Sequence, residues 1–135
     1  MKLSDTDGYE EDSELPKDKE WLYDIKELNV RDGIRDNGGA GQYLTSLLAF
    51  MNALNKYVNG IDDAYKNLDI KLYTVKMHSL RTSFAIVGAY DLAALSEALE
   101  AAGNRNDLDY IAENTDSFLS ECRSLYTKLT KLHSL

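Results

Sequence analysis

A single histidine, His78, stands in a stretch of the chain whose charged side chains are all basic. Residues 70–90 contain no Asp or Glu, and their charged side chains are Lys71, Lys76 and Arg81. A neutral imidazole beside fixed positive charge suits a nucleophile that accepts an anionic group. His78 is therefore the first candidate for chemistry in this sequence.

The neighbours of His78 on a helix would be small, neutral or basic. Met77 belongs to an apolar stripe, so an α-helix places His78 on the flank of that stripe and facing outward. The residues three, four and seven positions away share its face: they are Lys71, Thr74, Val75, Arg81, Thr82 and Ala85. This flat, partly apolar strip suits contact with a partner domain, although a lone exposed histidine is most often inert.

Apolar residues in four segments recur at spacings of three and four, which is the pattern of an amphipathic helix. They are Leu44, Leu47, Leu48, Met51, Leu54, Val58, Ile61, Tyr65 and Leu68 in the first segment, Tyr73, Met77, Leu80, Phe84 and Val87 in the second, Leu92, Leu95 and Leu99 in the third, and Leu108, Ile111, Thr115, Phe118, Cys122, Leu125, Leu129 and Leu132 in the fourth.

The predicted helix ends follow from capping residues. The first segment makes one helix of about 28 residues, or two with a kink at Asn59-Gly60. Asp69 caps the second helix, Asp91 caps the third, and the fourth begins near Asn106. With no strand alternation and short connections, the sequence predicts an all-α protein, an antiparallel four-helix bundle with an extra short N-terminal helix or arm.

The N-terminal part divides into a tail and an arm. Residues 1–19 are acidic and polar, and we expect a flexible tail or linker, with residues 20–135 forming the bundle domain. A short apolar group follows the tail and predicts an arm that packs on the domain: Trp21, Leu22, Ile25 and Leu28. Asn29 could cap a brief helix that ends before Asn37-Gly38-Gly39.

Composition excludes several classes of protein. The 135 residues carry a net charge of −8, which disfavours non-specific binding to nucleic acid or to an anionic membrane. One cysteine, Cys122, permits no internal disulfide and suggests a reducing compartment. No apolar run is long enough for a membrane span, and the N-terminus lacks a secretory signal, so we expect a cytoplasmic domain.

The region around His78 resembles the histidine-containing phosphotransfer (HPt) domains of bacterial phosphorelays. Their signature is H-x-L-K-G, a glycine six residues after the first, and then a helix with L-x-x-L-A-x-x-L-E-x-A. The matching residues here are His78-Ser79-Leu80-Arg81-Thr82, then Gly88-Ala89, then Leu92, Leu95, Leu99, Glu100 and Ala101, with Val30–Ile34 and Gly38-Gly39 resembling the family's first helix and double-glycine turn. The resemblance spans about residues 29–132.

The resemblance implies a phosphorelay intermediate. His78 would accept a phosphoryl group from a receiver-domain phosphoaspartate and pass it to another receiver aspartate. The partners would be response-regulator receiver domains. If the chain is a piece of a hybrid sensor kinase, as domains of this family often are, the kinase core of that parent chain would be a further partner. The Mg²⁺ would belong to the receiver, so the chain itself would hold no cofactor and no metal. Because one histidine face and a complete bundle need no second copy, we expect a monomer.

Two residues depart from the family pattern, and together they leave an alternative function open. Arg81 replaces the family's lysine and keeps its positive charge, which should disfavour the imidazolium and attract phosphoryl oxygens. Thr82 replaces a glycine, and it either bonds a phosphoryl oxygen or only fills space. The alternative function is a degenerate HPt bundle that docks receiver or kinase domains without carrying phosphate.

Other reactive residues have simpler interpretations. Lys71 would at most steer a partner, and Gly88 permits close helix approach. Cys122 lies on a core stripe, and His133 suits a helix C-terminus. Glu97 and Glu100 are expected on a solvated helix face, so a hydrolytic or metal-dependent bundle enzyme is the third and least favoured hypothesis.

Overall fold

The computed structural model describes residues 12–134, and within this range it contains helices and no strand. The elements are η1 (Lys17–Asp24), α2 (Val30–Asn37), α3 (Ala40–Lys66), α4 (Ile70–Ile86), α5 (Tyr90–Asn104), α6 (Leu108–Leu129) and η2 (Thr130–Ser134). The prediction of an all-α protein is confirmed. The first long segment is a single helix of 27 residues, α3, so the alternative of two shorter helices is wrong.

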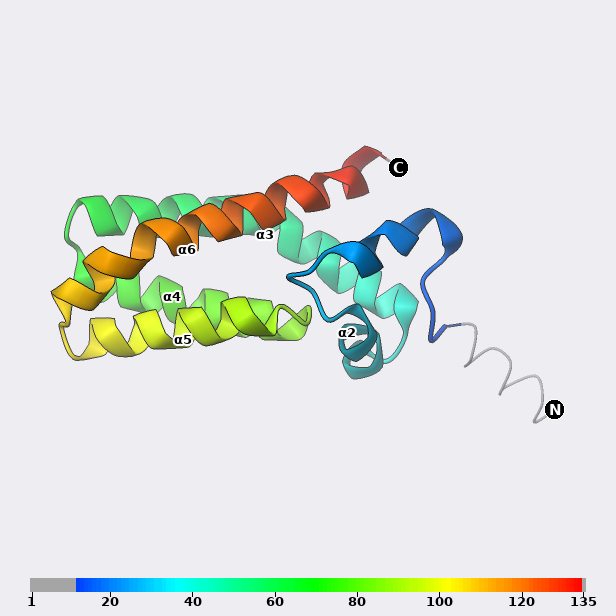
Figure 1. The fold of residues 1–135 in the computed structure, drawn as a ribbon, viewed down its shortest axis with the longest axis horizontal. Helices are drawn as coiled ribbons and strands as arrows, with labels where there is room; N and C mark the ends of the chain where they lie inside the picture. The colour runs from blue at the N-terminus through cyan, green and yellow to red at the C-terminus, as the bar shows by residue number, and fades with distance from the viewer. Residues whose placement is uncertain (1–11, 135) are drawn as a thin grey trace.

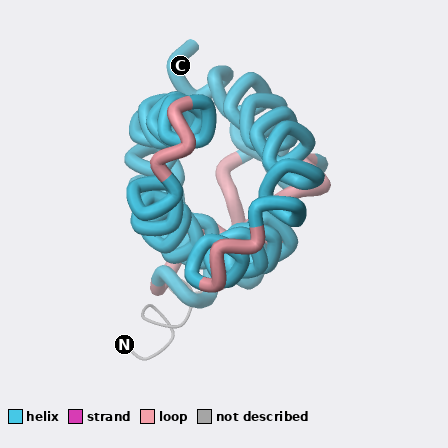
Figure 2. Tube along the Cα trace, turned by 90° about the vertical axis from the view of Figure 1, so that its left-hand side faces the viewer, coloured by secondary structure: helices cyan, strands magenta, loops and turns pink. Residues whose placement is uncertain are grey.

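Four long helices make up the body of the molecule. Helix α4 packs against α3 and α5, and α6 packs against the same two helices. Figure 1 shows α3 and α6 lying along the same direction as α4 and α5, with α2 beside one end of the group. Seen along that direction, the helices surround a shared interior (Figure 2). The packing is that of a helical bundle.

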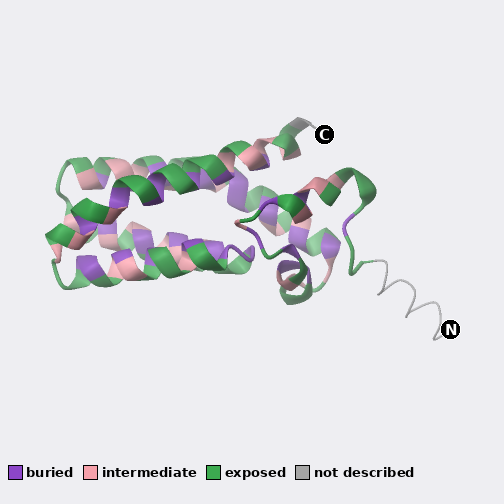
Figure 3. Ribbon diagram, viewed as in Figure 1, coloured by how far each residue is buried: buried purple, intermediate pink, exposed green. Residues whose placement is uncertain are grey.

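The core lies on the inward faces of these helices (Figure 3). The stripe predicted for α4 is fully buried from Tyr73 to Val87. Phe84 stacks edge-on against Phe118 of α6, with 6.3 Å between ring centroids. Burial raises the pKa of Tyr73 to about 12, and its hydroxyl lies 2.7 Å from the buried Thr115 hydroxyl. The side of α4 opposite His78 is thus fixed by packing.

Four leucines predicted on the apolar stripes are exposed instead: they are Leu48, Leu68, Leu95 and Leu108. Leu68 and Leu108 lie in or next to the turns, where the helical face that periodicity assigns is lost. Leu48 and Leu95 lie inside α3 and α5 but outside the buried faces of these helices, so the buried stripes are narrower than predicted. The aromatic core residues Tyr43 and Phe50 of α3 were absent from the predicted stripe and are buried.

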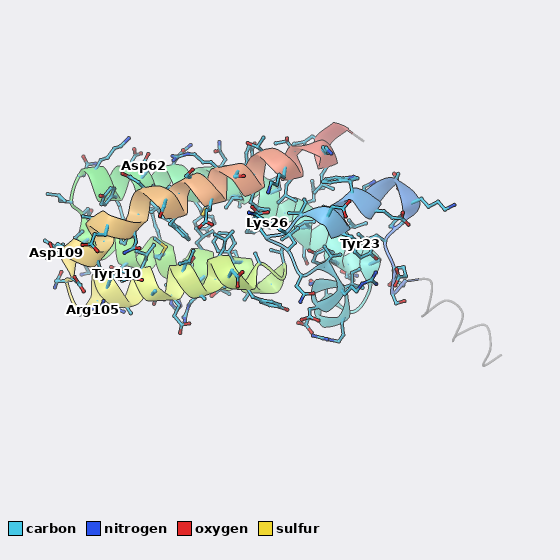
Figure 4. All side chains as sticks on the ribbon, viewed as in Figure 1. Tyr23, Lys26, Asp62, Arg105, Asp109 and Tyr110 are labelled. Carbon is cyan, nitrogen blue, oxygen red and sulfur yellow. The ribbon has the colours of Figure 1, made fainter. Side chains whose placement is uncertain are left out.

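Two of the three predicted caps are present, since the side chains of Asn29 and Asp69 accept backbone N–H bonds at the starts of α2 and α4. The last helix, α6, starts close to the predicted Asn106 and is capped by the Asp107 side chain. The prediction that Asp91 caps α5 is wrong, because that helix begins at Tyr90 with Ala89 at the cap position. Figure 4 shows Arg105 and Tyr110 together at the end of the bundle where α5 turns into α6, and the guanidinium lies 5.7 Å from the ring centroid.

The folded part of the chain begins earlier than residue 20. Leu15 is buried, and the backbone N–H of Ala40 donates to the carbonyl of Asp12. Residues 12–19 therefore contact the domain, whereas residues 1–11 of the predicted tail lie outside the described residues. The apolar arm is present as expected, with Leu22 fully buried and the Lys128 ammonium 2.9 Å from the Glu27 carboxylate. Along the described chain, no helix has the length and apolar character needed to cross a membrane.

Candidate functional site

His78 lies in the middle of α4 on its outward face, as the helical pattern predicted. Its side chain is 56% exposed, while Met77 and Leu80 beside it in sequence are fully buried. The helix is held at its start by the Asp69 cap and along its length by the buried stripe. A rigid backbone therefore presents the imidazole to solvent.

The imidazole is oriented by a carboxylate from the neighbouring helix. Glu100 of α5 places Oε2 2.7 Å from His78 Nδ1, and its own side chain is only 17% exposed. A carboxylate oxygen can only accept, so the neutral imidazole carries its hydrogen on Nδ1 and donates it to Glu100. The lone pair is then on Nε2, the ring nitrogen that Glu100 does not contact. This tautomer follows from the hydrogen-bond network.

Arg81 completes the cluster. Its Nε lies 3.3 Å from Glu100 Oε1, and its NH1 nitrogen lies 3.5 Å from Glu97 Oε2. Its NH2 nitrogen approaches His78 Nδ1 to 3.1 Å, which is a contact of two donors rather than a hydrogen bond when Nδ1 carries the hydrogen. Glu100 Oε1 is buried and has an ion-pair neighbour in Arg81, but no hydrogen-bond donor in line with it.

The surroundings of His78 differ from the predicted basic surface. Helix α4 itself has no acidic residue, but α5 brings Glu97 and Glu100 against Arg81. The expectation that both glutamates lie on a solvated face is wrong for Glu100, because α5 turns that side chain toward α4. The positive charge of Arg81 is thus opposed by two carboxylates, and it does not act on the imidazole alone.

Sequence reasoning missed Glu100 as a site residue, although a usable pattern was present. Glu100 follows the core residue Leu99 and therefore flanks the buried face of α5. A short turn, residues 87–89, joins α4 to α5 and makes them neighbours. An acidic side chain on the flank of α5 points either toward α4 or away from it, and α4 carries His78.

The other predicted site residues lie on the same helix but differ in access. Lys71, Val75 and Ala85 are exposed beside His78. Thr74 is half-buried, and a Cβ at Gly103 of α5 would collide with it, so its side chain fills the contact between two helices. The Thr82 hydroxyl is exposed and lies 3.4 Å from the His78 carbonyl oxygen, to which it donates.

Gly88 supports the site from a distance. Its φ of +83° lies in the left-handed region, and a Cβ there would come 2.5 Å from the carbonyl oxygen of Asn29. The Asn29 N–H donates to the Gly88 carbonyl across 2.8 Å. The glycine therefore permits the turn out of α4 and its close contact with the chain that enters α2.

The remaining reactive side chains lie apart from His78. Cys122 is buried in α6, and burial raises the pKa of its thiol. His133 is exposed in η2 at the C-terminal end. Among the described residues, no group of three or more His, Cys, Asp or Glu side chains is arranged to hold a metal ion. The cluster of His78, Arg81, Glu97 and Glu100 is thus the candidate site.

Comparisons of this chain with protein-family models, with curated proteins and with solved structures found no match.

Proposed function

We propose that the chain is a phosphotransfer domain that carries a phosphoryl group on His78 Nε2. The observation that carries the proposal is the exposed imidazole whose Nδ1 is bound by Glu100, because this leaves Nε2 as the nucleophilic nitrogen of a side chain that is 56% exposed. The resemblance to HPt domains supplies the reaction class, and the HPt motif and the geometry select the same histidine.

The step is an in-line displacement at phosphorus. The Nε2 lone pair attacks the phosphorus of a receiver-domain phosphoaspartate, the N–P bond forms, and the P–O bond breaks. The aspartate carboxylate leaves with the bonding electron pair. The receiver supplies Mg²⁺, and the transfer depends mainly on positioning and charge stabilisation. The reverse step, toward another receiver aspartate, returns the imidazole to its starting state.

Glu100 contributes to this step through the second ring nitrogen. When Nε2 bonds to phosphorus while Nδ1 keeps its hydrogen, positive charge develops on the ring. The carboxylate 2.7 Å from Nδ1 stabilises that charge and holds the ring plane during the attack. Glu100 is thus a positioning residue for His78.

Arg81 is the group that meets the phosphoryl oxygens. Its NH2 nitrogen already lies against the imidazole, and its side chain is 32% exposed. A planar guanidinium binds phosphoryl oxygens well. Replacing Arg81 with Ala should slow phosphoryl transfer to His78. An unchanged rate would show that Arg81 does not bind the phosphoryl oxygens.

The test measures transfer of the phosphoryl group to this chain from receiver domains that have been phosphorylated with acetyl phosphate in the presence of Mg²⁺. We expect acid-labile, base-stable phosphate on the purified chain. The His78→Gln variant should take up none, while His133→Gln, which alters the other histidine, should behave as the unsubstituted chain does.

Two other outcomes contradict the proposal in different ways. Binding of a receiver without any transfer would favour the docking module that carries no phosphate. Transfer that persists in His78→Gln would place the accepting group elsewhere on the chain.

A further inference from the structure

Glu97 stands at the edge of the site without touching the imidazole. Its carboxylate reaches Arg81 NH1 across 3.5 Å and is 67% exposed, whereas Glu100 on the other side of the guanidinium is 17% exposed. Glu100 already satisfies the orienting role toward His78. Glu97 is therefore a second, more loosely held anion on the same cation.

The surroundings of this pair leave Arg81 room to change partners. Arg81 and Glu97 line a shallow depression between α4 and α5, and the rest of its wall consists largely of small side chains: they are Thr82, Ala85, Ala93 and Ala94, with Tyr90 at the edge. The Arg81 side chain is 32% exposed and that of Glu97 is 67% exposed. Because their contact lies at the surface and not among the buried core residues, it can open without disturbing the core.

We infer that Glu97 sets the phosphoryl-transfer equilibrium by competing with the phosphoryl group for Arg81. The inference rests on the proposed function of His78. In the unphosphorylated chain Arg81 is shared between Glu97 and Glu100. When His78 carries the phosphoryl group, Arg81 pairs with the phosphoryl oxygens and Glu97 loses its partner.

The direction of the effect follows from the charges. One guanidinium faces two carboxylates, and a phosphoryl group adds between one and two further negative charges. Glu97 both repels that group and withholds its cation. It therefore weakens the phosphohistidine relative to the free imidazole, which favours passing the group on to a receiver.

The experiment measures the equilibrium between phosphorylated receiver and phosphorylated His78 for matched variants. Glu97→Gln should shift it toward phosphohistidine by about two- to fivefold, the range expected for a solvent-exposed ion pair. The shift should shrink as salt is raised, because exposed charges are screened. A purely structural role of Glu97 would produce no such salt dependence.

The control is Glu113→Gln, which removes the same charge from an exposed position on α6. It should leave the equilibrium unchanged. An equal shift in both variants would attribute the effect to net charge and overturn the inference, as would an unchanged equilibrium in Glu97→Gln. Absence of phosphate on the unsubstituted chain would instead remove the proposed function and this inference together.

Discussion

At the scale of single residues, the chemistry that we propose for this chain depends on which ring nitrogen of His78 is free. Glu100 accepts a hydrogen bond from His78 Nδ1, which leaves the lone pair on Nε2. Arg81 is positioned by two carboxylates rather than standing as an isolated charge. In the unphosphorylated chain the site is thus a cluster of one cation and two carboxylates beside His78, and the proposed function requires Arg81 to turn to an incoming phosphoryl group.

Substitutions of Glu100 separate its charge from its hydrogen bond. Glu100→Ala removes both and should slow transfer to His78 by about 10- to 100-fold, the range found when the group that orients a metal-bound histidine is removed. Glu100→Gln keeps an acceptor for Nδ1–H and should fall between Ala and the unsubstituted chain. Transfer rates from a charged receiver give the comparison, and equal rates in all three chains would show that Glu100 does not position the imidazole.

The residue scale also shows where sequence reasoning stops. The outward placement of His78 was predictable because residues of one helix share a face by periodicity alone. The contact with Glu100 was not, because it depends on how far α5 is rotated about its own axis against α4. That rotation is set by the packing of Leu92, Ser96 and Leu99, which no single-helix pattern contains.

At the scale of elements, the turn between α4 and α5 determines how the site residues of the two helices meet. Gly88 ends α4 with a left-handed backbone conformation, and α5 then runs back along α4. This brings Glu100 against His78 and Glu97 against Arg81. The caps of α2, α4 and α6 were predictable from Asn and Asp before apolar stripes. The start of α5 was not, because Ala89 supplies no side-chain cap and the turn is fixed by Gly88 instead.

Gly88→Ala tests this turn. A Cβ would meet the Asn29 carbonyl oxygen at 2.5 Å in a strained conformation, so we expect a loss of about 1–3 kcal/mol in the free energy of unfolding. Gly41→Ala is the matched control, because its Cβ would meet only Asp12 Oδ1 at 3.8 Å and its helical backbone favours alanine. Chemical denaturation measures both, and equal stabilities of the two variants would contradict the account of the turn.

At the scale of the whole molecule, the N-terminal arm belongs to the folded unit. Leu22 is fully buried, the Lys131 ammonium lies 5.1 Å from the Trp21 ring centroid, and Glu27 pairs with Lys128 of α6. The arm was predictable from its apolar spacing. The inclusion of residues 12–19 in the folded unit was not predictable. Their composition is acidic, Leu15 is the single buried residue among them, and no sequence pattern indicates the backbone hydrogen bond from Ala40 to Asp12.

Leu22→Ala measures how much the arm stabilises the domain. Removing a fully buried leucine should lower the free energy of unfolding by about 2–5 kcal/mol. Leu68→Ala is the comparison, because Leu68 is 72% exposed and its truncation should change stability little. Thermal or chemical unfolding measures the stability of both variants. A Leu22→Ala variant as stable as Leu68→Ala would show that the arm does not stabilise the core.

The most direct test of the account is the position of the phosphoryl group after the chain is mixed with a charged receiver. Nuclear magnetic resonance of the phosphorylated chain, recorded under alkaline conditions where phosphohistidine persists, distinguishes the two ring nitrogens. The account predicts one phosphoryl group on His78, bonded to Nε2, with Nδ1 still facing Glu100. A phosphoryl group on Nδ1, or none on His78, would contradict it.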